Sequence, residues 1–170
     1  HFPNGRTLQP AVAGTIARGH LPLHFTATKE DAVRAGEELR NPYQQPIAAA
    51  GTPADAVTLQ AELAASVSRG EGVYRIYCVA CHGASGAGDG PVAQRGFPPP
   101  PPLTSGKSAQ MKDGQLFHIL TYGQGSMSSM AAQLDHNKRW DAVNYVRALQ
   151  SQAAVATTPS PPSTSPPVQP

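Results

Sequence analysis

The stretch that decides the fold of this 170-residue chain is Tyr74-Arg-Ile-Tyr-Cys78-Val-Ala-Cys81-His82. It holds both cysteines of the chain, three positions apart and followed at once by a histidine. The residues before it repeat an apolar or small side chain at helical spacing, which predicts a helix that ends at Cys78. The members of this stripe are Leu59, Leu63, Val67, Gly70, Tyr74 and Tyr77.

The spacing Cys-x-x-Cys-His is the attachment signature of c-type haem. Two thiols one helical turn apart can add to the two vinyl groups on one edge of the porphyrin. The next residue, His82, then offers an imidazole nitrogen to the iron as the proximal ligand. We therefore predict one covalent haem c, held by Cys78, Cys81 and His82.

Two other chemistries are possible for the cysteine pair. A zinc site needs four ligands, and the chain has no second Cys-x-x-Cys; His118 and His136 could be recruited, but their spacing fits no common pattern. A thioredoxin-like dithiol would normally follow a β-strand in an α/β unit, and no such strand is predicted. Covalent haem is favoured over both.

Two further helices are predicted, and no stretch alternates with the period of a strand. The segment Asp113–Tyr122 places apolar residues on one face, with Asp113 as a possible N-cap and Gly123 as the stop. The last helix begins after Asp135 and presents Trp140, Val143, Val146 and Leu149. The sequence therefore predicts an all-α domain.

Composition divides the chain into three parts. Residues 1–57 carry five basic and five acidic side chains among frequent Pro and Gly, which predicts an extended segment that needs a surface, such as a partner protein, to lie on. A short helix over Lys29–Leu39, capped by Thr28, is possible there. Residues 58–152 form the compact helical domain, and residues 153–170 form a Pro/Ser/Thr-rich tail of polyproline or disordered character.

Charge and hydropathy exclude several functions. A net charge of +2 gives no basic surface for nucleic acid. No apolar run approaches the roughly 18 residues of a transmembrane helix. Because the chain begins at His1 without an initiator Met, we expect a targeting segment to have been removed.

The distal ligand is sought among three methionines and five further histidines. Met127 and Met130 lie in the Gly-rich loop Gly123–Met130, which can approach a haem face closely. Met111 has polar neighbours and is expected at the surface or filling a gap. The histidines are expected to be surface, partner-contacting or satisfied residues: His1, His20, His24, His118 and His136.

Positions 66–150 resemble class I c-type cytochromes, through Gly70-x-x-x-Tyr74-x-x-x-Cys78 and the last helix Arg139–Leu149. The resemblance implies that Gly70 permits a close crossing of the first helix by the last. A narrower likeness covers most of positions 9–150 and points to the monohaem cytochrome c subunit of bacterial alternative complex III, a membrane quinol-oxidising assembly. It rests on Pro10–Gly19, Gly88-Asp-Gly-Pro91, Arg95–Leu103 and Asp113–Gly123.

The resemblance implies a site as well as a fold. The family pattern Gly-x-Gly-x-Met-Pro falls on Gly123, Gly125 and Met127, so Met127 is favoured as the distal ligand. Ser128 stands where the family has proline, which loosens the loop and leaves Met130 as the alternative. A carbonyl of the run 98–102, that of Pro101, is implied as acceptor for the Nδ1–H of His82.

An iron with histidine and methionine on its two axial positions has no site left for a substrate, so the protein is expected to carry electrons and not to be an enzyme by itself. The resemblance implies as partners the other subunits of a quinol-oxidising complex and a soluble acceptor protein. It also implies a periplasmic or outer-membrane-face location, with attachment through partners or an upstream lipid anchor. The alternatives are a free or tethered cytochrome c that serves a terminal oxidase or reductase, and a haem peroxidase or gas-binding protein.

Overall fold

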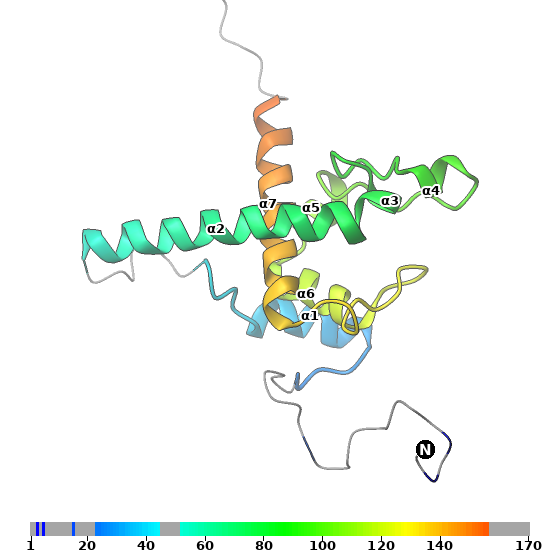
Figure 1. Ribbon diagram of the computed structural model, residues 1–170, viewed down its shortest axis with the longest axis horizontal. Coiled ribbons are helices and arrows are strands. Elements are labelled where there is room, and N and C mark those ends of the chain that lie inside the picture. The colour runs from blue at the N-terminus through cyan, green and yellow to red at the C-terminus, as the bar shows by residue number, and fades with distance from the viewer. Residues whose placement is uncertain (1–2, 4, 6–14, 16–22, 45–51, 157–170) are drawn as a thin grey trace, which may run out of the picture.

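The computed structural model describes residues 3, 5, 15, 23–44 and 52–156, and within them it is helical with no strand (Figure 1). This confirms the predicted all-α class. The elements in chain order are α1 (Lys29–Glu38), α2 (Pro53–Tyr77), α3 (Val79–His82), α4 (Pro91–Gln94), α5 (Gly106–Gln110), α6 (Asp113–Tyr122) and α7 (His136–Ala156).

The helix starts follow from their capping residues. Thr28 caps α1 by accepting a hydrogen bond from the backbone N–H of Asp31, as predicted. Thr52 and Asp55 form a reciprocal capping box at the start of α2. At α6 the prediction was wrong by one residue, because the cap position is Lys112 and Asp113 is already helical. The Asp113 carboxylate instead binds Arg147 on α7 at 2.7 Å.

The two long helices α2 and α7 cross at Gly70 (Figure 1). A Cβ atom on Gly70 would lie 2.0 Å from the carbonyl oxygen of Asp141, so only glycine permits this approach. Beside the crossing, the buried Asp141 carboxylate accepts hydrogen bonds from Ser66 at 2.5 Å and from Arg69 at 2.9 Å. The close crossing implied by the family resemblance is therefore present and is reinforced by an ion pair.

The core lies where α6 meets α2 and α7. One cluster consists of Val73, Leu134 and Ala142, with Leu120 and Met130 packed against it. A second cluster is built around Phe117, Trp140 and Val143, and the rings of Phe117 and Trp140 stack with centroids 4.3 Å apart. The partly buried residues packed on the second cluster are Leu23, Leu39, Tyr43, Leu116 and Leu120.

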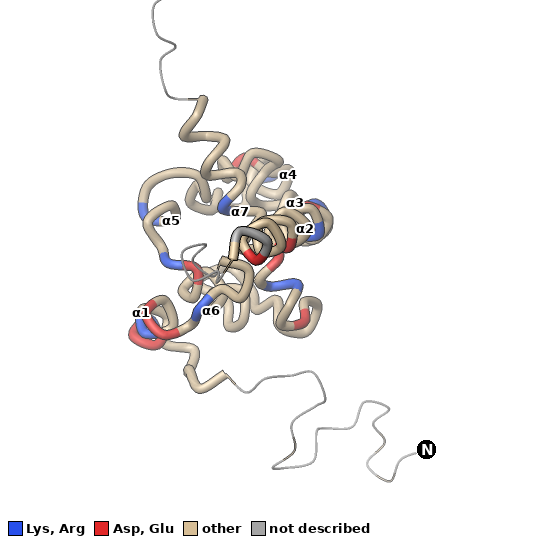
Figure 2. The backbone as a smooth tube through the Cα atoms, turned by 90° about the vertical axis from the view of Figure 1, so that its left-hand side faces the viewer, with Lys and Arg blue, Asp and Glu red and all other residues tan. Residues whose placement is uncertain are grey.

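Three of those packed residues belong to the N-terminal segment, which lies on the chain's own helical domain. Helix α1 runs beside α6 (Figure 2), and a Cβ on Gly114 would lie 2.0 Å from the carbonyl oxygen of Ala35. We expected residues 1–57 to require a partner protein as their surface. For residues 23–44 that surface is α6 and α7, because the segment has apolar side chains at Leu23, Leu39 and Tyr43 to bury there.

The other predicted boundaries can be compared only in part. Helix α2 already begins at Pro53, before the predicted boundary at residue 58. Helix α7 continues to Ala156, into the segment predicted as tail, and residues 157–170 lie outside the described residues. Among the helices that are described, none is both long and apolar enough to cross a membrane.

Candidate haem-binding site

The predicted attachment motif forms a single helical turn at the end of α2. Cys78 is the C-cap residue of α2, and the backbone N–H groups of Cys81 and His82 donate to its carbonyl oxygen at 3.2 and 2.9 Å. Side chains three and four positions apart share a face of such a turn. Cys78, Cys81 and His82 therefore come together on one side, and both cysteines are free and half-buried.

Burial sets the protonation of two of these groups. It raises the pKa of the Cys78 thiol to about 11, and the neighbouring Cys81 adds to this shift. It also lowers the pKa of His82, which favours the neutral imidazole. A neutral imidazole can donate a lone pair to iron, and a protonated thiol is a poor ligand for zinc.

A glycine-rich loop follows the motif and folds back on it. The N–H of Gly88 donates to the carbonyl of His82 at 2.8 Å, and that of Gly90 donates to the carbonyl of Cys81 at 3.2 Å. Gly83 takes φ +73°, and a Cβ there would lie 1.9 Å from Oδ1 of Asp89. Tyr74, itself buried on α2, donates its hydroxyl to the carbonyl of Gly83 at 2.8 Å. The backbone of the motif is therefore held from both sides.

Few residues around the motif are fully buried. Between Arg75 and Leu116 the only buried residues are glycines, namely Gly83, Gly86, Gly88, Gly90 and Gly114. Nδ1 of His82 is also buried, and it has no hydrogen-bond partner within the described chain. Apart from these glycines the segment buries no whole residue within the protein itself, and Nδ1 of His82 is left without a partner, so the residues present fit a haem.

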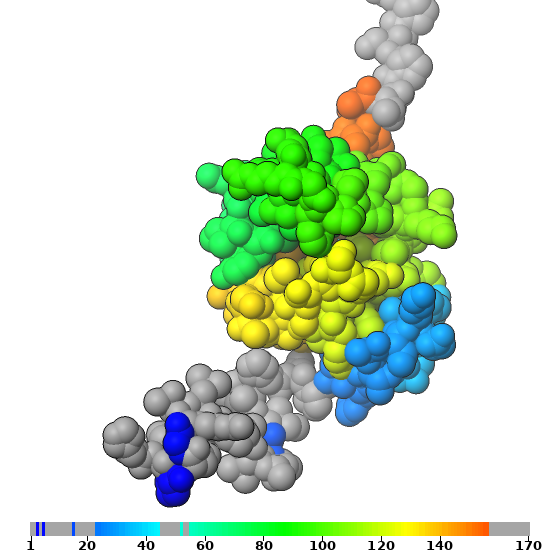
Figure 3. Space-filling view, turned by 90° about the vertical axis from the view of Figure 1, so that its right-hand side faces the viewer, coloured from blue at the N-terminus to red at the C-terminus, as the bar shows by residue number. Residues whose placement is uncertain are grey.

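The predicted distal loop faces the motif segment. Figure 3 shows residues after the motif, in green, across a furrow from the loop that follows α6, in yellow. Gly123 ends α6 at φ +82°, and a Cβ there would lie 2.4 Å from the carbonyl oxygen of Met127. Gln124 and Met127 exchange backbone hydrogen bonds, each 3.0 Å long. Met127 therefore sits in a tight hairpin that requires Gly123.

Met130 is placed differently from Met127. Its N–H donates to the carbonyl of Leu120 at 2.9 Å, and its side chain packs on the cluster of Val73, Leu134 and Ala142. A thioether that fills a core position is engaged in packing. This arrangement favours Met127 over Met130 as the ligand, so Met127 remains the prediction.

The structure does not pair His82 with Pro101. Nδ1 of His82 has no partner among the described residues, and Pro101 is exposed. The proline run instead turns its half-buried member, Pro100, toward the glycine loop, where a Cβ on Gly88 would lie 2.2 Å from the Pro100 carbonyl oxygen. The contact implied by the family resemblance is therefore not made here.

The two histidines considered for zinc lie elsewhere and have other partners. Nε2 of His118 contacts the carbonyl oxygen of Thr26 at 2.7 Å, and Nε2 of His136 accepts from the indole of Trp140 at 3.1 Å. In the described part of the chain no three His, Cys, Asp or Glu side chains are grouped to hold a metal ion. Met111 contributes its backbone carbonyl to Arg147.

Comparison with known proteins agrees with this site. The family model for subunit III of cbb3-type cytochrome c oxidase matches residues 65–146, which run from the middle of α2 to the middle of α7. No curated protein matches the chain. The matched region contains the motif turn, the glycine loop, the distal hairpin and the α2–α7 crossing. Residues 65–146 are therefore similar to a cytochrome c domain, and this supports a haem-based electron carrier.

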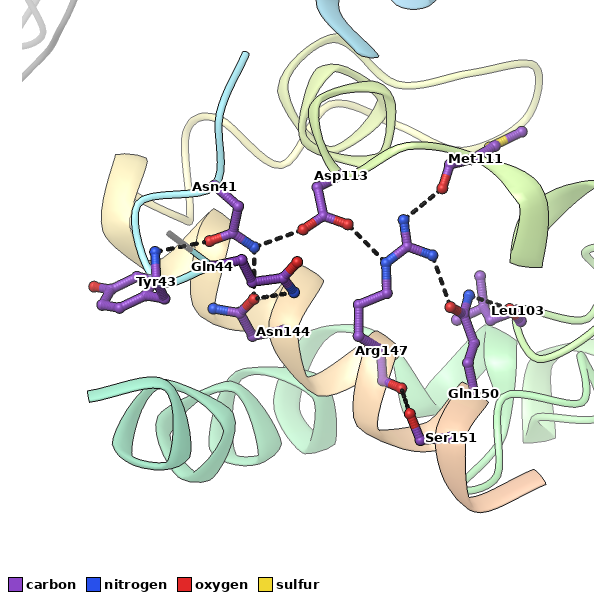
Figure 4. A network of polar contacts seen from close by, with 10 residues as sticks. All are labelled: Asn41, Tyr43, Gln44, Leu103, Met111, Asp113, Asn144, Arg147, Gln150 and Ser151. Atoms are coloured by element: carbon purple, nitrogen blue, oxygen red, sulfur yellow. Dashed lines mark hydrogen bonds and ion pairs between the residues drawn. The ribbon is translucent and has the colours of Figure 1, made fainter. Parts of the chain in front are cut away.

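Sequence reasoning missed the residues that join the N-terminal segment to this domain. Asn41 is buried and donates to Asn144 at 2.6 Å and to Asp113 at 2.7 Å (Figure 4). Phe25 and Thr26 offer backbone carbonyls to α6. A single asparagine and two backbone groups leave no periodic signal, so nothing in the sequence pattern marks them.

Proposed function

We propose that this protein is the haem c electron-transfer subunit of a membrane quinol-oxidising complex similar to alternative complex III. One covalent haem is attached to Cys78 and Cys81, with His82 and Met127 as axial ligands. When bound, the haem supplies reversible one-electron chemistry at its iron. Because both axial positions are taken by the protein, no position remains for a substrate.

The observation that carries the proposal is that two hydrogen-bonded turns, one with His82 and one with Met127, face each other. On one side the motif turn is held by bonds from Gly88 and Gly90, and on the other the Gln124–Met127 hairpin is held by Gly123. Rigid ligands on both faces limit rearrangement between redox states, which suits fast electron transfer. An open distal pocket would instead favour binding of a gas or peroxide.

An optical and chemical test addresses the haem. Acid–acetone extraction should leave the colour on the polypeptide, because thioether bonds resist it. The ferric protein should show the red-region charge-transfer band of methionine bound to iron, and the ferrous protein should not bind carbon monoxide without denaturant. Complete extraction of the colour would contradict covalent attachment, and carbon monoxide binding would support the peroxidase or gas-binding alternative.

Membership of a quinol-oxidising complex is supported by the sequence resemblance over positions 9–150 and by the balanced surface charge. Basic and acidic residues are interspersed along the described chain, and α1 carries both signs (Figure 2). Such a surface gives little long-range steering, so fixed docking to other subunits and short-range transfer to a soluble acceptor fit it. With such partners, the protein would work in the periplasm or on the outer face of the membrane.

Deletion of residues 1–22 tests the docking role of the outer part of the N-terminal segment. It spares residues 23–44, which pack on the haem domain, so the optical spectrum should be unchanged. We expect the truncated protein to be lost from the purified membrane complex. Stoichiometric co-purification of the truncated protein would assign the interface to the haem domain.

A second candidate is supported by the family match itself. The matched model describes a subunit of a terminal oxidase. In that case the protein would donate electrons to an oxidase and would co-purify with oxygen-consuming activity. Quinol oxidation without oxygen uptake in the purified assembly supports the first candidate, and oxygen uptake that depends on this chain supports the second.

A further inference from the structure

Two backbone carbonyls of the N-terminal segment contact side chains in the last turn of α6. The hydroxyl of Tyr122 donates to the carbonyl of Phe25 at 2.5 Å. Nε2 of His118 contacts the carbonyl of Thr26 at 2.7 Å, and since a carbonyl can only accept, Nε2 carries the proton. The two rings lie with centroids 4.8 Å apart, so they form one paired contact surface.

That turn of α6 is also the base of the distal loop. Gly123, which follows Tyr122 directly, donates its N–H to Ile119 at 2.7 Å. At the other end of the loop, the N–H of Met130 donates to the carbonyl of Leu120 at 2.9 Å, and the hydroxyl of Ser129 donates to the backbone carbonyl of Thr121 at 2.5 Å. Both ends of the loop that holds Met127 are thus attached to residues 119–122.

The two residues that supply these carbonyls, Phe25 and Thr26, are themselves held in place. The N–H and hydroxyl of Thr26 both donate to Oδ2 of Asp31, at 2.5 and 2.7 Å. Phe25 is buried under the guanidinium of Arg34, which lies 5.0 Å from its ring centroid. Behind them, α1 is held against α6 by the close approach of Ala35 to Gly114.

We propose that residues 23–26 act as a strap that positions the distal ligand, with Tyr122 and His118 as its positioning residues on α6. The strap keeps the last turn of α6 closed, and this keeps the Met127 hairpin seated. Loss of either contact lets the loop open more often and exposes the sixth position of the iron. This inference rests on the proposed role of Met127.

The test measures loop opening in the full-length holoprotein with imidazole as the probe. Imidazole can bind the ferric iron only after the distal ligand has left it, so its apparent affinity reports the open population. Tyr122→Phe removes one hydrogen bond and should tighten imidazole binding by about threefold to tenfold. Equal affinity in Tyr122→Phe and the parent would overturn the strap.

Tyr43→Phe is the matched control. It removes the same atom from a tyrosine of the N-terminal segment, whose hydroxyl accepts a hydrogen bond from Arg69 at 3.4 Å and makes no hydrogen bond to α6. Its imidazole affinity should equal that of the parent. A purely structural role for Tyr122 would lower the urea midpoint of unfolding and leave the imidazole affinity in buffer unchanged, which would also overturn the proposal.

The second contact provides a rescue experiment. His118→Leu cannot donate to Thr26 and should tighten imidazole binding, whereas His118→Gln keeps an N–H donor and should restore part of the parent behaviour. Equal affinities in these two variants would count against the contact. Met127→Ala separates the two proposals: a persistent methionine band would refute the ligand assignment, while its loss together with an unchanged Tyr122→Phe would refute the strap alone.

Discussion

The side-chain amide of Asn41 donates to Oδ1 of Asn144 at 2.6 Å, across 103 positions of the chain. The same amide also donates to the Asp113 carboxylate at 2.7 Å (Figure 4). Asn144 in turn donates to Ser66 on α2 at 2.8 Å. The Asn41 amide therefore connects the N-terminal segment directly to α6 and α7 and, through Asn144, to α2.

Asn41→Ala should lower the free energy of unfolding by about 1–3 kcal/mol, because it leaves buried polar partners short of a hydrogen bond. Urea unfolding of the holoprotein measures this loss. Gln44→Ala is the control, since its amide reaches the same Asn144 oxygen only at 3.4 Å. If Gln44→Ala lowered the free energy of unfolding as much as Asn41→Ala does, the buried Asn41 amide would not be a distinctive source of stability.

Two glycines of α2, two positions apart, should respond in opposite directions to alanine. Gly70→Ala places a methyl group against the Asp141 carbonyl and should cost about 3 kcal/mol. Gly72→Ala meets no atom within 4 Å and should stabilise the helix by about 0.5–1 kcal/mol. Thermal and urea unfolding of the pair would check this. If both variants unfold like the parent, the close crossing of α2 and α7 is wrong.

The two loop methionines should separate ligation from packing. Met127→Ala should abolish the methionine–iron charge-transfer band and leave the fold intact, because Met127 is outside both core clusters. Met130→Ala should keep the band and lower the free energy of unfolding by about 2 kcal/mol, because a core contact is removed. Optical spectra and unfolding curves of both variants would show which methionine is the ligand and which one packs in the core. Loss of the band in Met130→Ala alone would move the ligand to Met130.

The contribution of Asp135 to the free energy of unfolding should be lost at acidic pH. It caps α7 by accepting the N–H of Lys138 at 2.9 Å, and this bond, with the Lys138 charge, lowers its pKa below the ordinary 3.8. A lowered folded-state pKa gives stability that is complete above 3.8 and is lost as the pH falls through the folded value. Asp135→Asn keeps the cap without the charge, so it should be slightly less stable than the parent at neutral pH, and this difference should close as the pH falls below 3.8.

Asp135→Ala provides the control for this pH dependence. It removes the cap at every pH and should cost about 1 kcal/mol at neutral pH. Unfolding by urea at neutral and acidic pH would measure all three proteins. Parallel pH profiles for the parent and Asp135→Asn would contradict the assignment.

The helical class, the motif turn and the bounds of α1 and α6 could be predicted from local signals. Thr28, Gly123 and the apolar stripe ending at Cys78 each act within one or two turns of the chain, where sequence spacing and geometry coincide. The Gly70 contact was also foreseen, but only from the family resemblance. These features describe elements and not how distant elements meet.

The contacts between distant elements could not be predicted in this way. Residues 23–44 have too few apolar side chains for their sequence to predict a packed segment. Their attachment to the helical domain depends on Asn41 and on the carbonyls of Phe25 and Thr26. The Pro101 contact, which the structure does not show, likewise depends on how the run of five prolines lies against another part of the chain. Neither the attachment of residues 23–44 nor the position of Pro101 produces a periodic pattern of residues that could be recognised in one sequence.

The confinement of burial to glycines between Arg75 and Leu116 has a consequence for biogenesis. The helices α1, α2, α6 and α7 bury their side chains against one another, so this frame can assemble in the newly made chain. The intervening segment has little to bury until the cofactor is joined to it. Under the proposed function, the motif stays accessible for haem attachment at the end of an already ordered helix, and attachment would be the step that completes the fold.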